Sequence, residues 1–257
     1  MENVQNQNGL MKDKDIVIIG RNAVLEALDE HQPIQKVLLQ KGITGELEVE
    51  IRNRCKELEV PYAAVPVQQL DKWARGRHQG LIALRSPVRF YALNDVVQKA
   101  YEEGEMPFIL ALDGVQDVRN FGAITRTAEA MGVHGVLFPA KGTAMLNEFS
   151  VKASAGSLLR QPLIRVRSLE NALTELKMSG LKILGADLRA EQSIQNVSFL
   201  EPIALVMGSE GKGLRPHIIR LLDERFFIEQ TGAAESLNVS VATGIALYQA
   251  QMARMNK

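Results

Sequence analysis

The sequence predicts an α/β protein with two domains: a small N-terminal α/β domain at residues 15–87 and a larger domain at residues 108–257 built on a mostly parallel sheet. Short apolar runs of strand length alternate with helical patterns along most of the chain, which is typical of sheets covered by helices. The stretch 88–107 interrupts this alternation. Polar segments that contain glycine follow several of the apolar runs, where α/β proteins commonly bind ligands.

Length and composition are those of an ordinary globular protein. With 257 residues, of which 46% are hydrophobic and 23% charged, the chain can bury a core without disulfides or metal. Lysine plus arginine and aspartate plus glutamate both number 30, so a polyanionic partner must be bound by a local basic patch. Cys55 is the single cysteine, which excludes an intramolecular disulfide and a cysteine-rich zinc site and fits a reducing compartment.

The N-terminal residues and the lack of long apolar runs predict a cytoplasmic protein. Residues 1–14 are polar and lack the apolar segment of a signal peptide, so we expect a flexible tail. No run approaches the roughly 18 apolar residues that span a bilayer.

In the N-terminal domain, apolar runs predict strands, and patterns with a period near 3.6 predict helices. The expected strands are 16–19, 37–39, 62–65 and 81–84, and the expected helices are 23–28 and 46–58. Cys55 shares one face of the second helix with Leu47, Ile51 and Leu58, which predicts a packing role for its side chain.

Residues 88–107 are expected to form a linker with a short helix, because this charged stretch is flanked by prolines and has only a weak amphipathic pattern at 93–100. In the C-terminal domain, strands are expected at 108–112, 135–138, 163–166, 182–185, 204–207 and 226–228, alternating with helices. The last helix is expected at 239–255, with Val241, Ile245, Tyr248 and Met252 on one stripe.

The first polar segment, 120–128, lies at the start of a predicted helix. Its apolar stripe contains Ile124 and Ala128, so Asn120 either caps the helix or faces a ligand at the helix N-terminus. Arg126 lies off the stripe and is either a solvated helix arginine or a ligand-binding cation.

The second polar segment, 205–214, follows a buried-looking strand and reads GSEGKG over 208–213. Its glycines permit positive φ and let a ligand approach the backbone. The glycine spacing fits neither the P-loop nor the dinucleotide fingerprint. Glu210 disfavours a phosphate and suits a ligand with a cationic centre or hydroxyl groups, unless it is a solvated residue of a tight turn.

The third polar segment alternates Ser236, Asn238 and Ser240 with apolar residues just before the final helix. Such residues commonly cap helices. They can also hydrogen-bond a substrate, together with the free backbone amides of the helix N-terminus.

In order and spacing, these three segments resemble the signature motifs of the SpoU, or TrmH-type, branch of the SPOUT RNA methyltransferases. The resemblance covers 110–255, and GRNAV at 20–24 with HQG at 78–80 resembles, over a shorter stretch, the RNA-substrate-binding domain of the rRNA (guanosine-2′-O-)-methyltransferases. It implies methyl transfer from S-adenosylmethionine to a ribose 2′-hydroxyl, a homodimer and a deep C-terminal trefoil knot. Pattern alone predicts a doubly wound sheet, because threaded chains are rare.

The resemblance also assigns roles to individual residues. The catalytic positions of the family correspond to Asn120, Arg126, Glu210, Ser236 and Asn238, and the backbone positions that hold the cofactor correspond to Gly208, Ile228 and Leu237. Two departures stand out. The chain lacks the proline that often follows Asp117, and Glu229-Gln230 replaces the usual Pro-Met. The absence of proline at position 229 predicts weaker cofactor binding, because the loop samples more conformations before binding.

A basic turn at 71–80 is the candidate RNA-binding segment. It carries Arg75, Arg77 and His78 beside Trp73, the only tryptophan of the chain. An aromatic ring next to cations suits looped or single-stranded RNA. The alternative is a solvated turn with Trp73 packed into the domain. The four histidines show no metal-ligand spacing, and the expected reaction needs no metal.

We expect the ribose oxygen to attack the sulfonium methyl group in line. Because a guanidinium is a poor proton acceptor, Arg126 is expected to hold a phosphate and stabilise the developing oxyanion. The alternatives are a tRNA substrate, base methylation within the superfamily, a non-catalytic RNA-binding protein and a nucleotide-dependent oxidoreductase. A base methyltransferase would lack the Asn120 and Arg126 motif, a non-catalytic relative would have lost Arg126 or Asn238, and the oxidoreductase fingerprint is missing.

Overall fold

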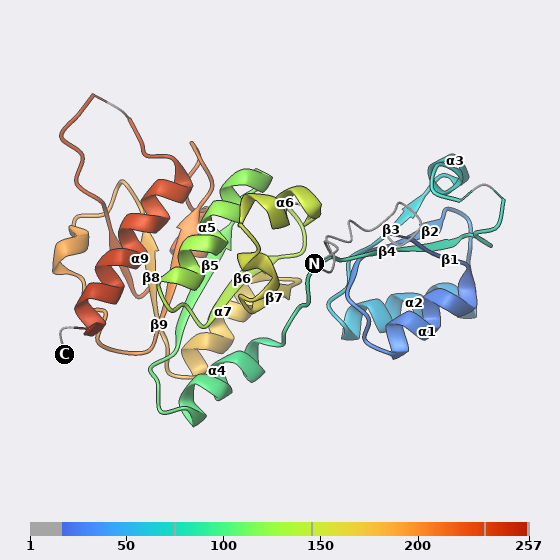
Figure 1. Cartoon of the computed structure of the whole chain (residues 1–257), viewed down its shortest axis with the longest axis horizontal. Helices are drawn as coiled ribbons and strands as arrows, with labels where there is room; N and C mark the ends of the chain where they lie inside the picture. The colour runs from blue at the N-terminus through green and yellow to red at the C-terminus, as the bar shows by residue number, and fades with distance from the viewer. Residues whose placement is uncertain (1–16, 75, 145, 234, 256–257) are drawn as a thin grey trace, which may run out of the picture. The chain divides into compact units, whose positions relative to one another are not determined.

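The computed structural model describes residues 17–74, 76–144, 146–233 and 235–255, which form two compact units (Figure 1). The first unit ends at Ser86 and the second begins at Pro87. The expected tail, residues 1–14, lies outside the described residues. None of the described helices is both long and apolar enough to cross a membrane.

The first unit is a four-stranded sheet with helices on both faces. Its strands are β1 (Val17–Ile19), β2 (Ile34–Gln40), β3 (Tyr62–Val65) and β4 (Leu81–Arg85), in the order β1-β4-β2-β3. Its helices are α1 (Arg21–Asp29), α2 (Glu46–Glu57) and α3 (Val67–Asp71). Cys55 of α2 is buried with Ile51 against Val37, as the helical pattern predicted. Leu38 points to the other face, where it packs with Leu70 of α3.

The second unit is built on a six-stranded sheet in which every neighbouring pair is parallel. Its strands are β5 (Phe108–Asp113), β6 (Gly135–Pro139), β7 (Leu163–Val166), β8 (Lys182–Ala186), β9 (Ile203–Gly208) and β10 (Glu224–Phe226), in the order β10-β8-β9-β5-β6-β7. This confirms the expected α/β class with a mostly parallel sheet. The trefoil knot stays a prediction.

Helices cover both faces of this sheet, because successive strand residues point to opposite sides. Leu110 and Leu112 pack in the cluster that holds residues of α5 (Val118–Ala130) and α9 (Val239–Met255). Ile109 and Ala111 pack in the cluster on the other face, with residues of α4 (Leu93–Glu102) and α7 (Leu169–Met178). Two further short helices are α6 (Glu148–Ala153) and α8 (Pro216–Ile219).

Residues 88–107, expected to be a linker with a short helix, contain α4. The apolar side of α4 is fully engaged in the second unit: Leu93, Val96 and Val97 are buried in the cluster that contains Ile109. The compact second unit accordingly includes this stretch from Pro87 onward.

Two elements near the site differ from the expectation. The last strand ends at Phe226, so Ile228 lies beyond β10 instead of inside it. Helix α9 has the expected bounds, but the stripe containing Val241, Ile245 and Tyr248 is exposed. The core side of α9 instead carries smaller residues such as Thr243 and Ala246 because it packs closely on α5.

Candidate functional site

Two of the three polar segments start side by side at the carboxyl edge of the sheet. In the pairing of β5 with β9, Asp113 and Gly208 are register partners, and each is the last residue of its strand. The chain then continues from β5 to α5 and from β9 into the loop 209–213. The parallel arrangement therefore brings together two segments that are about ninety residues apart in the sequence. One result is the hydrogen bond between Asn120 and Glu210.

Asp117, not Asn120, caps helix α5. The Asp117 carboxylate accepts hydrogen bonds from the backbone amides of Arg119 at 2.8 Å and Asn120 at 2.9 Å. The pKa of Asp117 lies below its ordinary value, mainly because the Asn120 amide stabilises the carboxylate. Partial desolvation raises this pKa, and the Arg119 amide lowers it further. With the cap supplied by Asp117, the side chain of Asn120 is available for other partners.

The loop after β9 is a tight turn that needs its glycines. Gly211 and Gly213 have φ values of 76° and 64°, and the backbones of Ser209 and Gly213 hydrogen-bond each other in both directions. A Cβ on Gly208 would lie 2.2 Å from the carbonyl carbon of Gly213. The loop is fixed at its far end by buried Asp113, which accepts from the backbone amide and the side chain of Arg215 at 2.9 and 2.6 Å.

Asn238 both caps α9 and joins the other two segments. Its Oδ1 accepts from the Ser240 amide at 2.9 Å, so its Nδ2 faces the opposite way. That Nδ2 donates to Asn120 Oδ1 and to Glu210 Oε1, each at 3.2 Å, and Asn120 Nδ2 donates to Glu210 Oε2 at 3.3 Å. We call Asn120, Glu210 and Asn238 the polar triad. The two readings of Asn238, cap and ligand-facing group, are therefore compatible.

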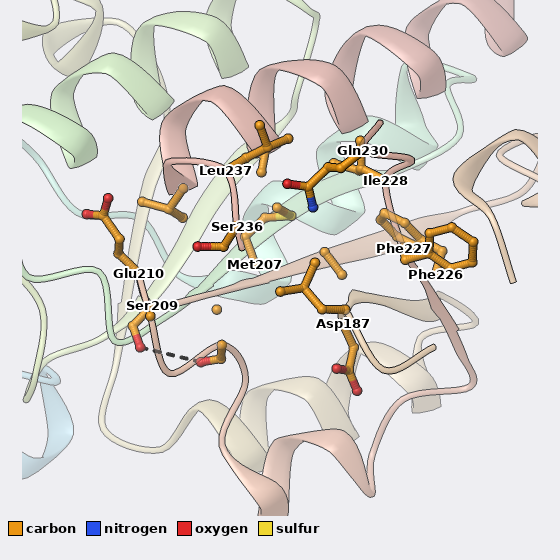
Figure 2. A pocket seen from close by; sticks show the side chains of 17 residues that line it. Asp187, Met207, Ser209, Glu210, Phe226, Phe227, Ile228, Gln230, Ser236 and Leu237 are labelled. Atoms are coloured by element: carbon orange, nitrogen blue, oxygen red, sulfur yellow. Dashed lines mark hydrogen bonds between the residues drawn. The ribbon is translucent and has the colours of Figure 1, made fainter. Parts of the chain in front are cut away.

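A pocket adjoins the polar triad at Glu210, which is one of its lining residues (Figure 2). It is partly open to solvent and is lined by residues of both the loop after β9 and the segment before α9. Five of the catalytic and cofactor positions assigned from the resemblance line it: Gly208, Glu210, Ile228, Ser236 and Leu237. In Figure 2, Ser209 and Glu210 lie at one end and Phe226 and Phe227 at the other, while Gln230 lies between them.

The loop that carries Glu229 and Gln230 has contacts that replace part of the expected proline restraint. The side chain of Ser193 donates to the Glu229 carboxylate. Phe227 forms a backbone bridge with Ser193 and is hydrogen-bonded to Gln192 and Ile194. Gln230 lines the pocket.

Arg126 does not join the polar triad within the described chain. It is exposed on α5, and its side chain forms no hydrogen bond or ion pair with the residues that the structure describes. Six residues beyond Asn120 correspond to about 9 Å along the helix and about 240° around it, so the two side chains leave α5 in different directions.

The basic turn is exposed at Trp73 and Arg77, whereas Arg75 lies outside the described residues. Trp73 is 48% exposed and is not packed into the core. His78 is buried, and both of its ring nitrogens are engaged: Nδ1 accepts from the Gly80 amide at 2.9 Å and Nε2 lies 3.2 Å from Asp71 Oδ1. Its ring therefore holds the turn in place.

A second hollow lies beside this turn, in the first unit. Arg21, Gln40, Asp71 and Gln79 are among its lining residues. The exposed Arg21 donates through Nε to the Gln79 backbone at 3.2 Å, which ties the GRNAV and HQG segments together.

Sequence reasoning missed three residues of the C-terminal site. Asp117 precedes a helical stripe, which is an ordinary N-cap signal. Asp187 follows β8 at the carboxyl edge of the sheet, where ligand sites are expected, and it lines the pocket. The part played by Asp113 depends on its contact with Arg215, and no local pattern indicates this contact.

Comparison with known proteins agrees with this arrangement. The sequence profile of the SpoU rRNA Methylase family matches residues 107–248, and that of the RNA 2′-O ribose methyltransferase substrate-binding domain matches residues 17–91. The Bacillus subtilis protein YacO, whose name assigns it to the TrmH family of tRNA/rRNA methyltransferases, is 33% identical over 93% of this chain and 96% of its own length. A Staphylococcus aureus protein named for the same family is 34% identical over 92% and 95%.

Solved structures share the fold. AviRb of Streptomyces viridochromogenes, a SpoU methyltransferase in complex with AdoMet, has a TM-score of 0.60 at 21% identity, over 94% of this chain and 91% of its own. The TrmH/SpoU tRNA-modifying enzyme of A. aeolicus has a TM-score of 0.54 at 34% identity, over 64% of this chain and 85% of its own.

Proposed function

Because this chain belongs to the SpoU rRNA methylase family of RNA methyltransferases, we propose that it transfers a methyl group from S-adenosylmethionine to a ribose 2′-hydroxyl of ribosomal RNA. The observation that carries the proposal is the polar triad at the edge of the pocket: three separate segments meet there through direct hydrogen bonds. A base methyltransferase of the same superfamily is expected to lack the Asn120 and Arg126 motif, so the presence of these side chains favours ribose methylation.

The pocket residues fit S-adenosylmethionine. The backbone at Gly208 has no room for a side chain, so the loop 209–213 closes directly onto the end of β9. The pocket has an apolar end for an aromatic base and a polar end with Glu210 and Ser236 for a sulfonium and the reacting ribose. The bound cofactor supplies a methyl group activated by the neighbouring positive sulfur.

The polar triad orients the acceptor ribose in this proposal. Glu210 accepts hydrogen bonds from a ribose hydroxyl, while Asn120 and Asn238 hold the carboxylate in position. Ser236, exposed at the rim of the pocket, offers a further hydroxyl to the substrate. Arg126 holds a backbone phosphate of the RNA and stabilises the 2′-oxyanion as it develops.

Completing this site requires a second copy of the chain. Arg126 leaves α5 away from the polar triad of its own chain and is unpaired within the described residues. Helix α9, which packs on α5, exposes Val241, Ile245 and Tyr248. Exposed apolar side chains grouped on one helix are typical of protein contacts. In the proposed homodimer this stripe is covered by the partner, and Arg126 of the partner enters the site.

The first unit selects the RNA. Since the net charge of the whole chain is zero, binding depends on local cations, and Arg21 and Arg77 are both exposed near the second hollow. Trp73 offers an exposed ring on which an unpaired base can stack. Arg75 and His78 complete the proposed set, His78 as the residue that holds the turn.

Methyl transfer to defined RNAs tests the function. Purified protein is incubated with methyl-labelled S-adenosylmethionine and either unmodified ribosomal RNA or unmodified tRNA, and the product is hydrolysed with alkali. We expect label in ribosomal RNA and an alkali-resistant linkage at one position, because a 2′-O-methyl group blocks cleavage at that nucleotide. Label only in tRNA would reassign the substrate, and an alkali-labile product would indicate base methylation.

A further inference from the structure

Gln230 presents an unsatisfied polar atom to the pocket. Its Oε1 is buried and has no hydrogen-bond partner among the residues that the structure describes. Gln230 is one of the lining residues, and Figure 2 shows its amide turned toward the interior of the pocket. Native proteins leave few buried oxygens without a donor, because such an atom loses its water without compensation. A donor from outside the chain is therefore expected at this position.

The surroundings of Gln230 indicate what kind of donor this is. Ile228 and Met207 lie beside its amide, and Phe226 and Phe227 line the pocket beyond them. Asp187 lies at this side as well, but its carboxylate is engaged by Arg225 Nη1 at 3.1 Å and by the Arg189 amide at 3.0 Å. An apolar wall disfavours a charged ligand group and suits a flat aromatic ring. The matching donor is an uncharged N–H on the edge of such a ring.

We propose that the Gln230 side chain recognises the adenine base of S-adenosylmethionine, with Oε1 accepting a hydrogen bond from the 6-amino group. The inference rests on the proposed function, since it takes this cofactor as the occupant of the pocket. A side-chain amide carries an acceptor and a donor next to each other, and the adenine edge carries an amino donor next to a ring-nitrogen acceptor. The amide thus distinguishes adenine from a purine that lacks the amino group.

This assignment changes the expected effect of the Glu229-Gln230 departure. From the sequence alone, these residues were expected to weaken cofactor binding relative to Pro-Met. The contacts of Ser193 with Glu229 and Phe227 restrain the loop. Gln230 adds a polar contact that methionine lacks. Gln230→Met is therefore expected to weaken binding.

A comparison of two ligands in three proteins tests the proposal. S-adenosylhomocysteine and its purine analogue, which lacks the 6-amino group, are titrated by calorimetry into the wild-type protein, Gln230→Met and Gln195→Met. Gln195 is an exposed glutamine of the same unit and serves as the matched control. The wild type and the control are expected to prefer the adenine compound about three- to tenfold, the effect of one hydrogen bond. Gln230→Met is expected to bind S-adenosylhomocysteine about three- to tenfold more weakly than the wild type does, and to bind the two compounds about equally.

Two results from the Gln230→Met variant would overturn the proposal while leaving the proposed function intact. One is a Gln230→Met protein that keeps the full preference for the amino group, and the other is one that binds S-adenosylhomocysteine as tightly as the wild type or more tightly. A wild type without preference for the amino group would overturn it independently of how any variant folds. A wild type that binds neither compound would overturn the cofactor assignment itself. This outcome is distinguishable from the others because in all of them the wild-type protein still binds S-adenosylhomocysteine.

Discussion

Asn238 Nδ2 donates a hydrogen bond to Asn120 Oδ1 at 3.2 Å, although the two residues lie 118 positions apart. This contact links the start of α9 to the first turn of α5, and Glu210 accepts from both amides. Because Asn238 Oδ1 is occupied by the Ser240 amide, the amide group of Asn238 cannot turn over without losing the helix cap. The cap of one helix thus fixes the orientation of the polar triad.

Asn238→Asp is expected to lower methyl transfer about 10²-fold at neutral pH. The carboxylate keeps the cap acceptor but places a second negative charge beside Glu210, whose Oε1 lies 3.2 Å from the replaced nitrogen. Since two adjacent carboxylates raise the pKa of one of them, part of the activity should return as pH falls. Single-turnover rates across pH measure this, with Asn238→Ser as a cap-preserving control. A profile parallel to that of the wild type would contradict it.

Arg126→Ala is expected to lower methyl transfer by about 10²-fold or more, as for loss of a group that stabilises an oxyanion. Binding of S-adenosylmethionine should stay near normal, because Arg126 does not line the pocket. Turnover and calorimetric titration separate the two effects. Turnover close to that of the wild type would remove Arg126 from the site.

Mixed dimers test whether Arg126 acts in the partner copy. Arg126→Ala and Asn120→Ala chains carrying different tags are expressed together, and the heterodimer is purified through both tags. If Arg126 acts across the dimer, one of the two sites is intact, so the heterodimer should recover about half of the wild-type rate. An inactive heterodimer would place Arg126 in its own chain's site, and a purely monomeric protein would contradict the dimer.

Arg77→Ala combined with Arg75→Ala is expected to weaken RNA binding and to flatten its dependence on salt. Each phosphate contact contributes about 0.7 to 0.9 to the slope of log K against log salt, so the slope should fall by about 1 to 2. Arg52→Ala, an exposed arginine of α2 paired with Glu48, is the matched control. An unchanged slope would mean that the basic turn does not contact phosphate.

Asp117→Ala is expected to lower the free energy of unfolding by about 1 kcal/mol at pH 7, the usual effect of losing an N-cap. The pKa of Asp117 is lowered in the folded state, first by the Asn120 amide. The charge therefore contributes stability above the ordinary aspartate pKa, and this contribution is lost as pH falls through the folded value. Because the side chain is exposed, the charge adds little beyond the hydrogen bonds. Denaturant unfolding at pH 7 and below pH 4 should show the difference shrinking in acid.

Gly208→Ala is expected to abolish cofactor binding and to destabilise the second unit. Its Cβ would meet the Gly213 carbonyl carbon at 2.2 Å and the Leu214 amide nitrogen at 2.5 Å, so the loop has to move. Gly232→Ala is the control, because a Cβ at Gly232 meets nothing within 4 Å. Titration of S-adenosylmethionine into both variants measures the effect. Normal binding by Gly208→Ala would show that the loop is not part of the site.

The strands and the final helix could be predicted largely from local pattern. The apolar runs placed β5 and β7 within a residue of their bounds, and the helical period gave α9 its full length. The pattern failed at β10, where Ile228 continues an apolar run but lies beyond the strand, at the pocket. An apolar residue suits a buried strand and a pocket wall equally, so composition does not separate them.

The sequence by itself determined the α/β class and the family, because periodicity and short motifs are local properties of the chain. Only the tertiary structure decided how Asn120, Glu210 and Asn238 meet, since their contacts depend on which strands are neighbours in the sheet. It also decided that Asp117 and not Asn120 caps α5, and that the apolar stripe of α9 faces outward. In each case a polar or apolar side chain had several possible partners, and the packing of distant segments selected one.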